Sequence, residues 1–204
     1  MKKALIAVVM MTGATAWAGQ SAKRAERNVT VCIGHGQDEV TSQALEVASK
    51  IFAGTGVRMQ WHENVRYCQA HPEEAILVSY SHNTPKDRRP GALAYAFPYE
   101  GVHIEVFYDR LLGNSSDIAR ARILGHVLAH EITHIMQATA RHAESGVMKA
   151  RWSYADLRAM QSQLLRFTEG DITLINRGLD VRAAQATHQA RGTIVAAALT
   201  NDRQ

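Results

Sequence analysis

The alternation of polar and apolar positions in the first part of the chain predicts a strand, a helix and two further strands. Residues 28–33 (NVTVCI) alternate as a half-buried strand does, and Asp38 is placed to cap a helix after them. Residues 57–62 (VRMQWH) and 75–80 (AILVSY) predict the further strands. The helix and its end are marked by Val40, Ala44, Val47, Ala48, Ile51, Gly54 and Gly56. This order favours a mixed sheet with at least one parallel pair.

A polar loop and a hairpin are predicted next. Residues 81–90 (SHNTPKDRRP) contain two prolines and no apolar periodicity, which is typical of an exposed loop. Residues 91–97 (GALAYAF) and 102–108 (VHIEVFY) predict two strands. The residues between them, 98–101 (PYEG), have the composition of a tight turn.

The second half of the chain is predicted to be helical. Residues 114–117 (NSSD) offer N-cap side chains, and a long amphipathic helix follows. Its apolar positions are Ile118, Ile123, Leu124, Val127, Leu128 and Ile135. Ser153 then caps a helix from Tyr154 to Phe167. Residues 171–204 are rich in alanine and poor in large apolar side chains, so we expect a C-terminal tail that is partly helical and packs weakly.

The N-terminus has the pattern of a secretory signal peptide. Lys2 and Lys3 precede an uncharged, largely apolar stretch, and Ala16-Trp17-Ala18 is a small-x-small cleavage pattern. A membrane anchor would need about 20 apolar residues, and this stretch is interrupted earlier. We therefore expect residues 1–18 to be a leader cleaved after Ala18, a secreted or periplasmic protein, and no membrane span in the mature form.

The charge balance gives no support for nucleic-acid binding. Two of the 23 basic side chains lie in the leader, which leaves 21 basic against 19 acidic side chains. About 186 mature residues suit one domain with one core. No internal repeat or second domain is indicated, and the sequence predicts no particular oligomeric state.

Cys32 and Cys68 are the chain's two cysteines. Export would place them in an oxidising compartment, where a disulfide between the first strand and the loop after the second can persist. The alternative is a pair of buried thiols. A zinc site built on them is disfavoured, because neither cysteine belongs to a CxxC pair, in which two residues separate the cysteines.

The central motif is His130-Glu131-Ile132-Thr133-His134, an HExxH sequence on the predicted long helix. Four-residue spacing places the two imidazoles one turn apart on one face, where both can reach one metal ion. Glu131 lies beside that face and can act on a water molecule without being a ligand. A helix with two ordinary histidines is the alternative reading.

A catalytic zinc site needs a third protein ligand. His126 lies on the same stripe, but about 12 Å of helix separates its backbone from that of His134, so we expect a structural role for it. His142 can bind if the helix ends near residues 138–140, which the break at Ser145-Gly146 favours. A carboxylate from a later segment, such as Asp156 or Glu169, is the other possibility.

These residues resemble the metzincin clan of zinc peptidases, and in particular small secreted bacterial metzincin-like proteins. The resemblance rests on Leu124-Gly125-His126, His130-Glu131, His134, His142, Gly146-Val147-Met148 and Ala150-x-Trp152. It departs from the usual HExxHxxGxxH pattern, because Gln137 and Ala140 stand at the glycine and third-histidine positions. The loop to His142 is therefore two residues longer.

The resemblance implies an α+β fold for residues 19–170. This fold has a small, mixed, mostly parallel sheet with an antiparallel edge strand, a backing helix and the long HExxH helix. It also implies Zn²⁺ bound by His130, His134 and His142, with Met148 in a supporting turn. Residues 91–97 would form the edge strand above the cleft, although an ordinary hairpin strand is equally compatible with them. Tyr154 is a weak candidate for a further site residue.

The implied activity is hydrolysis of peptide bonds in a peptide or protein substrate, with Glu131 as general base. The residue spacing itself does not distinguish a peptide from another amide or an ester. The alternative function is a catalytically inactive domain that binds metal or a protein on the same scaffold. Retention of Glu131 argues against that alternative.

Overall fold

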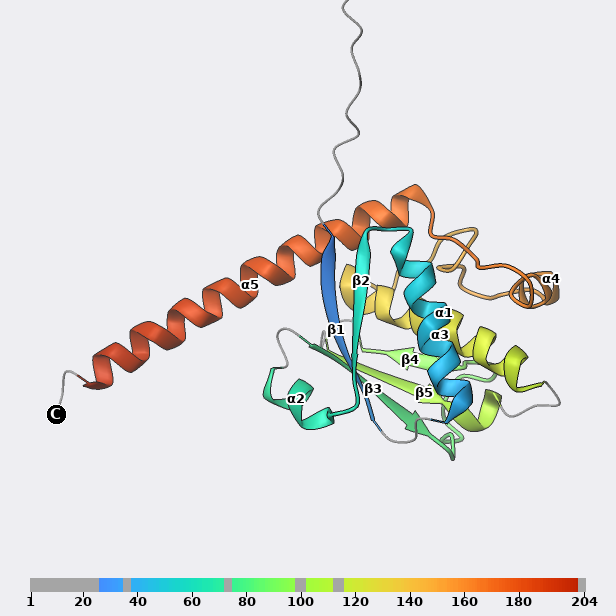
Figure 1. Ribbon diagram of the computed structural model, residues 1–204, viewed down its shortest axis with the longest axis horizontal. Coiled ribbons are helices and arrows are strands. Elements are labelled where there is room, and N and C mark those ends of the chain that lie inside the picture. The colour runs from blue at the N-terminus through green and yellow to red at the C-terminus, as the bar shows by residue number, and fades with distance from the viewer. Residues whose placement is uncertain (1–25, 35–37, 72–74, 98–101, 112–115, 202–204) are drawn as a thin grey trace, which may run out of the picture.

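A five-stranded sheet forms the centre of the protein (Figure 1). The structure is a computed structural model that describes residues 26–34, 38–71, 75–97, 102–111 and 116–201. Side chains are described as far as residue 188. The leader and the expected turn at 98–101 lie outside these residues. In chain order the elements are β1 (Arg27–Ile33), α1 (Glu39–Ala53), β2 (Val57–His62), α2 (Val65–Ala70), β3 (Ala75–Ser81), β4 (Ala94–Ala96), β5 (His103–Phe107), the 3-10 turn η1 (Tyr108–Leu111), α3 (Asp117–Gln137), α4 (Tyr154–Ala159) and α5 (Glu169–Asn201).

The strand order is β2-β1-β3-β5-β4, and four of the strands are parallel. β4 pairs with β5 alone and runs antiparallel to it, so β4 is an edge strand. The predicted fold class is thus confirmed: an α+β architecture with a mostly parallel sheet and an antiparallel edge. β4 is shorter than the predicted strand at 91–97, because Gly91 turns the chain with a positive φ of 78°.

Helices α1 and α3 pack together over one face of the sheet (Figure 1). Apolar side chains that alternate along the strands face the two helices, and they include Val29, Val31, Ile76, Val78, Ile104 and Val106. The two helices meet closely at Gly125, where an added Cβ would lie 2.5 Å from the Val47 side chain and 2.8 Å from the Ala44 carbonyl oxygen. Glycine at this position of α3 lets the two backbones approach.

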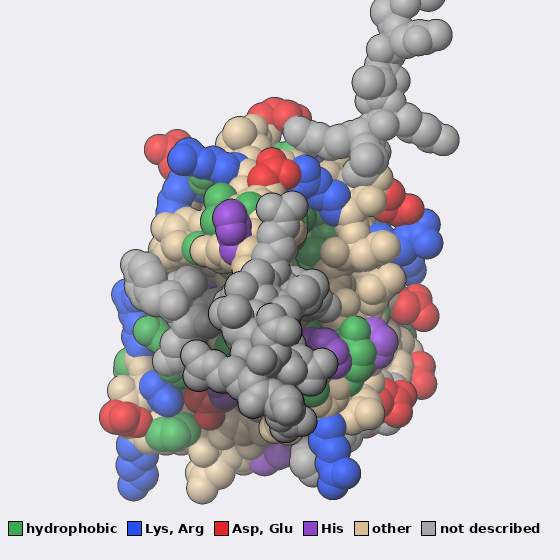
Figure 2. Space-filling model, turned by 90° about the vertical axis from the view of Figure 1, so that its left-hand side faces the viewer, with side chains coloured by type: hydrophobic (Ala, Val, Ile, Leu, Met, Phe, Trp, Pro, Cys, Tyr) green, Lys and Arg blue, Asp and Glu red, His purple; other side chains and the backbone are tan. Residues whose placement is uncertain are grey.

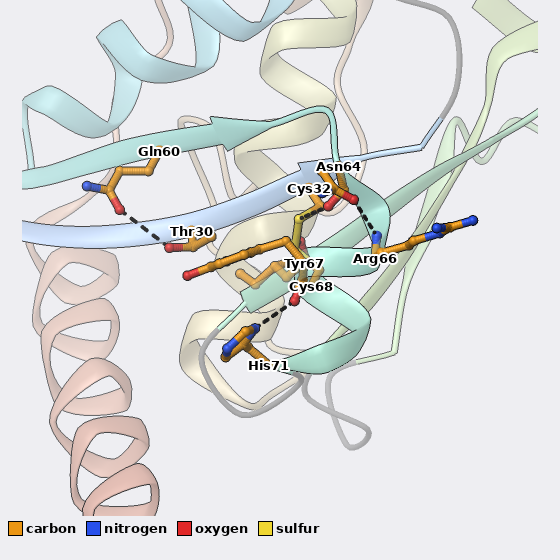
Figure 3. The surroundings of a disulfide bond; sticks show 9 residues. Thr30, Cys32, Gln60, Asn64, Arg66, Tyr67, Cys68 and His71 are labelled. Atoms are coloured by element: carbon orange, nitrogen blue, oxygen red, sulfur yellow. Dashed lines mark hydrogen bonds between the residues drawn. A yellow bond between two sulfur atoms is a disulfide. The ribbon is translucent and has the colours of Figure 1, made fainter.

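The opposite face of the sheet carries α2 and the disulfide. Cys32 of β1 and Cys68 of α2 are bonded, which confirms the predicted bridge (Figure 3). Both cysteines are buried in a small cluster with Ala75 and Leu77, separate from the main core. Helix α2 was not predicted from the sequence. It is a six-residue helix whose start is capped by the Asn64 side chain.

Helix α4 is shorter than the predicted helix at 154–167. A capping box between Ser153 and Asp156 starts it, but the helix ends at Ala159, and the C-cap residue Met160 is fully buried. Beyond that point the backbone makes tertiary hydrogen bonds instead. The Leu165 N–H donates to the His126 ring, and the Arg166 carbonyl accepts from the Val147 N–H.

Helix α5 extends from the domain into space at its C-terminal end (Figure 1). The sequence predicted weak packing for this tail. The first turns of α5 instead pack closely, since Asp171 and Ile175 are fully buried. Gly178 lets α5 cross the end of α3, because a Cβ there would overlap the Met136 carbonyl oxygen.

None of the described helices is both long and apolar enough to cross a membrane. Basic and acidic side chains are interspersed on the face that Figure 2 shows.

The end of α3 has an unusual backbone. Ala138 adopts the left-handed conformation, with φ 49° and ψ 41°, and its N–H donates to the carbonyls of His134 and Ile135. Glycine is the common residue at such a cap, because an L-residue there is strained by its Cβ. The chain leaves the helix axis at this residue.

We predict that Ala138→Gly stabilises the chain by about 1 kcal/mol, since relief of the left-handed strain exceeds the added entropy of the unfolded state. Thermal unfolding of the metal-free protein measures this change. Ala140→Gly is the matched control, because Ala140 is exposed in the same loop with no positive φ. The control should be neutral or slightly destabilising. A lower melting temperature for Ala138→Gly than for wild type would contradict the assignment.

We also predict that replacing Cys32 and Cys68 together by alanine lowers the free energy of unfolding by about 4 kcal/mol. In the chain-entropy model this is the effect of a cross-link across 36 residues. Denaturant titration of the oxidised and substituted proteins measures the difference. Thiol titration of unfolded, unreduced protein should find no free thiol, and two reactive thiols per chain would refute the bridge.

Candidate metal centre

His130 and His134 project from one face of α3, one turn apart, and both are buried. Their Nε2 atoms are 3.1 Å apart. The i and i+4 positions of a regular helix place the two rings side by side, as the HExxH spacing predicts. Their side chains therefore converge at one point beside the helix.

Backbone carbonyls fix the tautomers of both rings. His130 Nδ1 lies 2.8 Å from the Val147 carbonyl oxygen, and His134 Nδ1 lies 2.8 Å from that of Thr139. A carbonyl oxygen only accepts, so each Nδ1 must carry the proton and each neutral ring turns a lone pair on Nε2 toward the other. Two such lone pairs repel each other at 3.1 Å, and a cation shared between them removes the repulsion.

His142 completes the group from the loop after α3. Its ring centroid lies 5.3 Å from that of His130 and 4.9 Å from that of His134. One nitrogen of each ring lies within 4.8 Å of the others, and among the described residues this is the group that could hold a metal ion. The helix end at Ala138 brings His142 back beside α3, so the structure places the three predicted ligands together.

The donor set fits Zn²⁺. Zinc binds imidazole nitrogen at about 2.0–2.1 Å in tetrahedral geometry, which separates two ligand nitrogens by about 3.3 Å, close to the observed separation of the α3 pair. Burial lowers the pKa of His130 to about 4. Burial also lowers the pKa of His134, and burial with the nearby Arg89 and Arg141 lowers that of His142. All three imidazoles are therefore neutral at pH 7, as metal binding requires.

The turn at 146–149 contacts the metal-facing helix through its backbone. Gly146 has a positive φ of 75°, and a Cβ on it would overlap the Arg166 carbonyl oxygen. The turn places the Val147 carbonyl where it accepts a hydrogen bond from His130 Nδ1. The Met148 carbonyl accepts from the Ala143 N–H at 2.7 Å. Met148 itself is fully buried in the main core. The contact that this turn makes with the histidines is the hydrogen bond between the Val147 carbonyl and His130 Nδ1, and a supporting role for Met148 stays a prediction.

His126 lies outside the metal group. It is fully buried, its Nδ1 donates to the Arg122 carbonyl at 2.7 Å, and its Nε2 accepts from the Leu165 N–H at 3.1 Å. Both ring nitrogens are used, so the histidine is structural, as expected. Trp152 packs edge to face against both His126 and His130, with the His130 ring centroid at 5.6 Å. This tryptophan closes one side of the His130 ring.

Glu131, next to His130 on α3, contacts the edge strand β4. Burial raises the pKa of its carboxyl to about 7, and a hydrogen bond from the Ala96 backbone of β4 lowers it in part. The carboxyl can therefore take up and release a proton near neutral pH. Its contact with Ala96 also ties the HExxH helix to the strand that has a free edge.

The alternative third ligands do not join the group. Asp156 is held by the Lys149 ammonium at 2.6 Å and by Ser153, and these bonds lower its pKa to about 2. Glu169 is exposed at the start of α5 and is outside the metal group. Tyr154 is 76% exposed, so it is not packed against the histidines.

Sequence reasoning missed the residues that hold the ligand loop. Arg141, next to His142, donates to Asp171 of α5 at 2.8 Å. No local pattern signals this contact, because the two residues are 30 positions apart. The carbonyls of Thr139 and Val147 were also missed, since any residue type supplies a carbonyl. The sequence shows that Asp171 is an acidic residue in an alanine-rich tail. Only the structure shows that it is buried.

Comparison with solved structures shows a fold shared with one of them. The sequence matches no family model, and no curated protein is significantly similar to it. A solved zinc-dependent peptidase from Methanocorpusculum labreanum is 12% identical, with a TM-score of 0.53 over 72% of this chain and 99% of that one. The crystal structure of archaemetzincin from Methanopyrus kandleri is 14% identical, with a TM-score of 0.49 over 77% of this chain and 98% of that one. The likeness to the Methanocorpusculum labreanum protein shows a shared fold.

Proposed function

We propose that the chain is a zinc-dependent peptidase that binds Zn²⁺ through His130, His134 and His142 and uses Glu131 as its general base. One observation carries the proposal: three neutral imidazoles converge beside a carboxyl group whose pKa is raised to about 7. The fold shared with the Methanocorpusculum labreanum zinc-dependent peptidase supports peptide bonds as the substrate. The leader-like residues 1–18 support action outside the cytoplasm, after cleavage behind Ala18.

The residues of the chain divide the chemistry between them. A bound Zn²⁺ would polarise the scissile carbonyl and acidify a water molecule. Glu131 takes the proton of the attacking water and passes it to the leaving amine, and its burial, which raises the pKa of the carboxyl, makes it a better proton acceptor than an exposed carboxylate. The Thr139 and Val147 carbonyls hold the imidazoles in the tautomer that leaves Nε2 free.

The edge strand β4 offers a place for an extended substrate. It pairs with β5 on one side, and no described strand pairs with its other side. A peptide that added a strand there would lie against the element whose Ala96 backbone contacts Glu131. Such pairing uses main-chain hydrogen bonds, so it favours unfolded or extended polypeptide over compact protein.

We predict that wild type binds one Zn²⁺ per chain and that His142→Ala weakens this binding by about 100-fold or more, since loss of outer-shell partners alone costs about 10–100-fold. Competition with a chromophoric chelator measures the affinity. Asp156→Ala and Glu169→Ala are the controls, because these carboxylates are the alternative ligands, and both should keep wild-type affinity. Loss of zinc in a control, with full affinity in His142→Ala, would refute the ligand set.

The role of Glu131 is tested with Glu131→Gln, which removes a base without removing a ligand. The variant should fold, keep its zinc and lose about 10²- to 10⁴-fold in the rate of hydrolysis of an unfolded protein or a peptide library. Hydrolysis at the wild-type rate would exclude Glu131 as the base. If zinc-loaded wild type cleaves no peptide and no ester, the inactive metal-binding domain is the better description.

A further inference from the structure

We infer that the ion pair between Arg141 and Asp171 positions His142 for metal binding and thereby couples helix α5 to the metal centre; this inference rests on the zinc site proposed above. The starting observation is a difference among the three ligands. His130 and His134 are each oriented by a backbone carbonyl. Within the described part of the chain, no hydrogen bond reaches the imidazole of His142, which is exposed.

The position of His142 therefore depends on how the loop that carries it is held. On its C-terminal side, the Ala143 N–H donates to the Met148 carbonyl at 2.7 Å. On its N-terminal side, the Arg141 N–H makes a local bond to the Thr139 hydroxyl at 3.3 Å. The long-range contact on that side is the guanidinium of Arg141, which reaches Asp171 at 2.8 Å.

Asp171 is a fixed anchor for this contact. Its side chain is fully buried, and its second carboxylate oxygen accepts from the Thr168 N–H at 3.0 Å and the Thr168 hydroxyl at 2.6 Å. The Thr168 hydroxyl accepts in turn from the Asp171 N–H at 3.2 Å, so the pair forms a capping box at the start of α5. A buried carboxylate held by two donors besides Arg141 keeps its position better than a surface partner would.

The anchor is itself fastened to the HExxH helix. The Gln137 amide of α3 donates to the Asp171 carbonyl at 3.3 Å, and Gly178 of α5 lies directly against the Met136 carbonyl. The first turns of α5 are thus fixed to the end of the helix that carries two ligands. Through Arg141 they also fix the third ligand, so one ion pair connects both parts of the metal group.

A structural role alone predicts a different pattern of effects. An ion pair that only helped α5 to dock would change the stability of the fold and would leave zinc affinity unchanged in folded protein. A pair that positions His142 changes zinc affinity, and it does so through His142. The two roles are therefore separated by a double-mutant cycle on metal affinity.

The experiment measures Zn²⁺ affinity of the full chain by chelator competition, at a temperature where circular dichroism shows each variant to be folded. Asp171→Asn and Arg141→Gln should each weaken binding by about 10–100-fold, with little further loss when combined. In a His142→Ala background, Asp171→Asn should cause no additional loss. Arg58→Gln is the matched control, since it removes an exposed arginine–carboxylate pair with Glu26, away from the loop, and should keep wild-type affinity.

Each outcome decides the inference. Wild-type affinity in both Asp171→Asn and Arg141→Gln, or an equal loss with and without His142, would overturn the positioning role while leaving the zinc site in place. Wild type that binds no zinc would overturn the proposed function and this inference together. If Asp171→Asn does not fold, Arg141→Gln and Arg141→Lys carry the test, because Arg141 is 42% exposed and its substitution disturbs the core less.

Discussion

A straight helix can bring two imidazoles to one point, but not three, and the metal centre depends on this constraint. Successive histidines four residues apart lie about 6 Å further along the axis, so a third imidazole on the same face is out of reach. The chain must leave the helix and return. Ala138 makes this possible by taking a left-handed conformation, which ends α3 at Gln137. His126, which stays on the helix, is consequently structural.

The same exit from the helix supplies the hydrogen bonds of the site. Once the chain turns at Ala138, the Thr139 carbonyl is free to accept from His134, and the turn at Gly146 brings the Val147 carbonyl to His130. Both contacts fix a tautomer and an orientation with groups that cannot change charge. The geometry of the ligands is therefore set by backbone, and the residues that matter most for it are those that control backbone direction.

The sequence predicted the parts of this arrangement that depend on local periodicity. The strand at 57–62 and the pairing of His130 with His134 follow from spacing alone, and His142 follows once the helix is required to end. The parts that depend on tertiary contacts could not be predicted in this way. Residues 161–167 have a helical pattern, but their backbone bonds to His126 and Val147 instead of continuing α4. The role of Asp171 as the partner of Arg141 could be recognised only from the structure, which shows that it is buried.

The disulfide has a consequence for how the unfolded chain is constrained. It closes the segment between Cys32 and Cys68, whereas a metal ion on the three histidines would close the segment between His130 and His142. These loops do not overlap, so each cross-link restricts its own part of the unfolded ensemble and their entropic effects add. Strands β3, β4 and β5 lie in the interval that neither loop encloses. Neither cross-link would therefore restrict the unfolded chain in the interval that contains these three strands, including the strand that contacts Glu131.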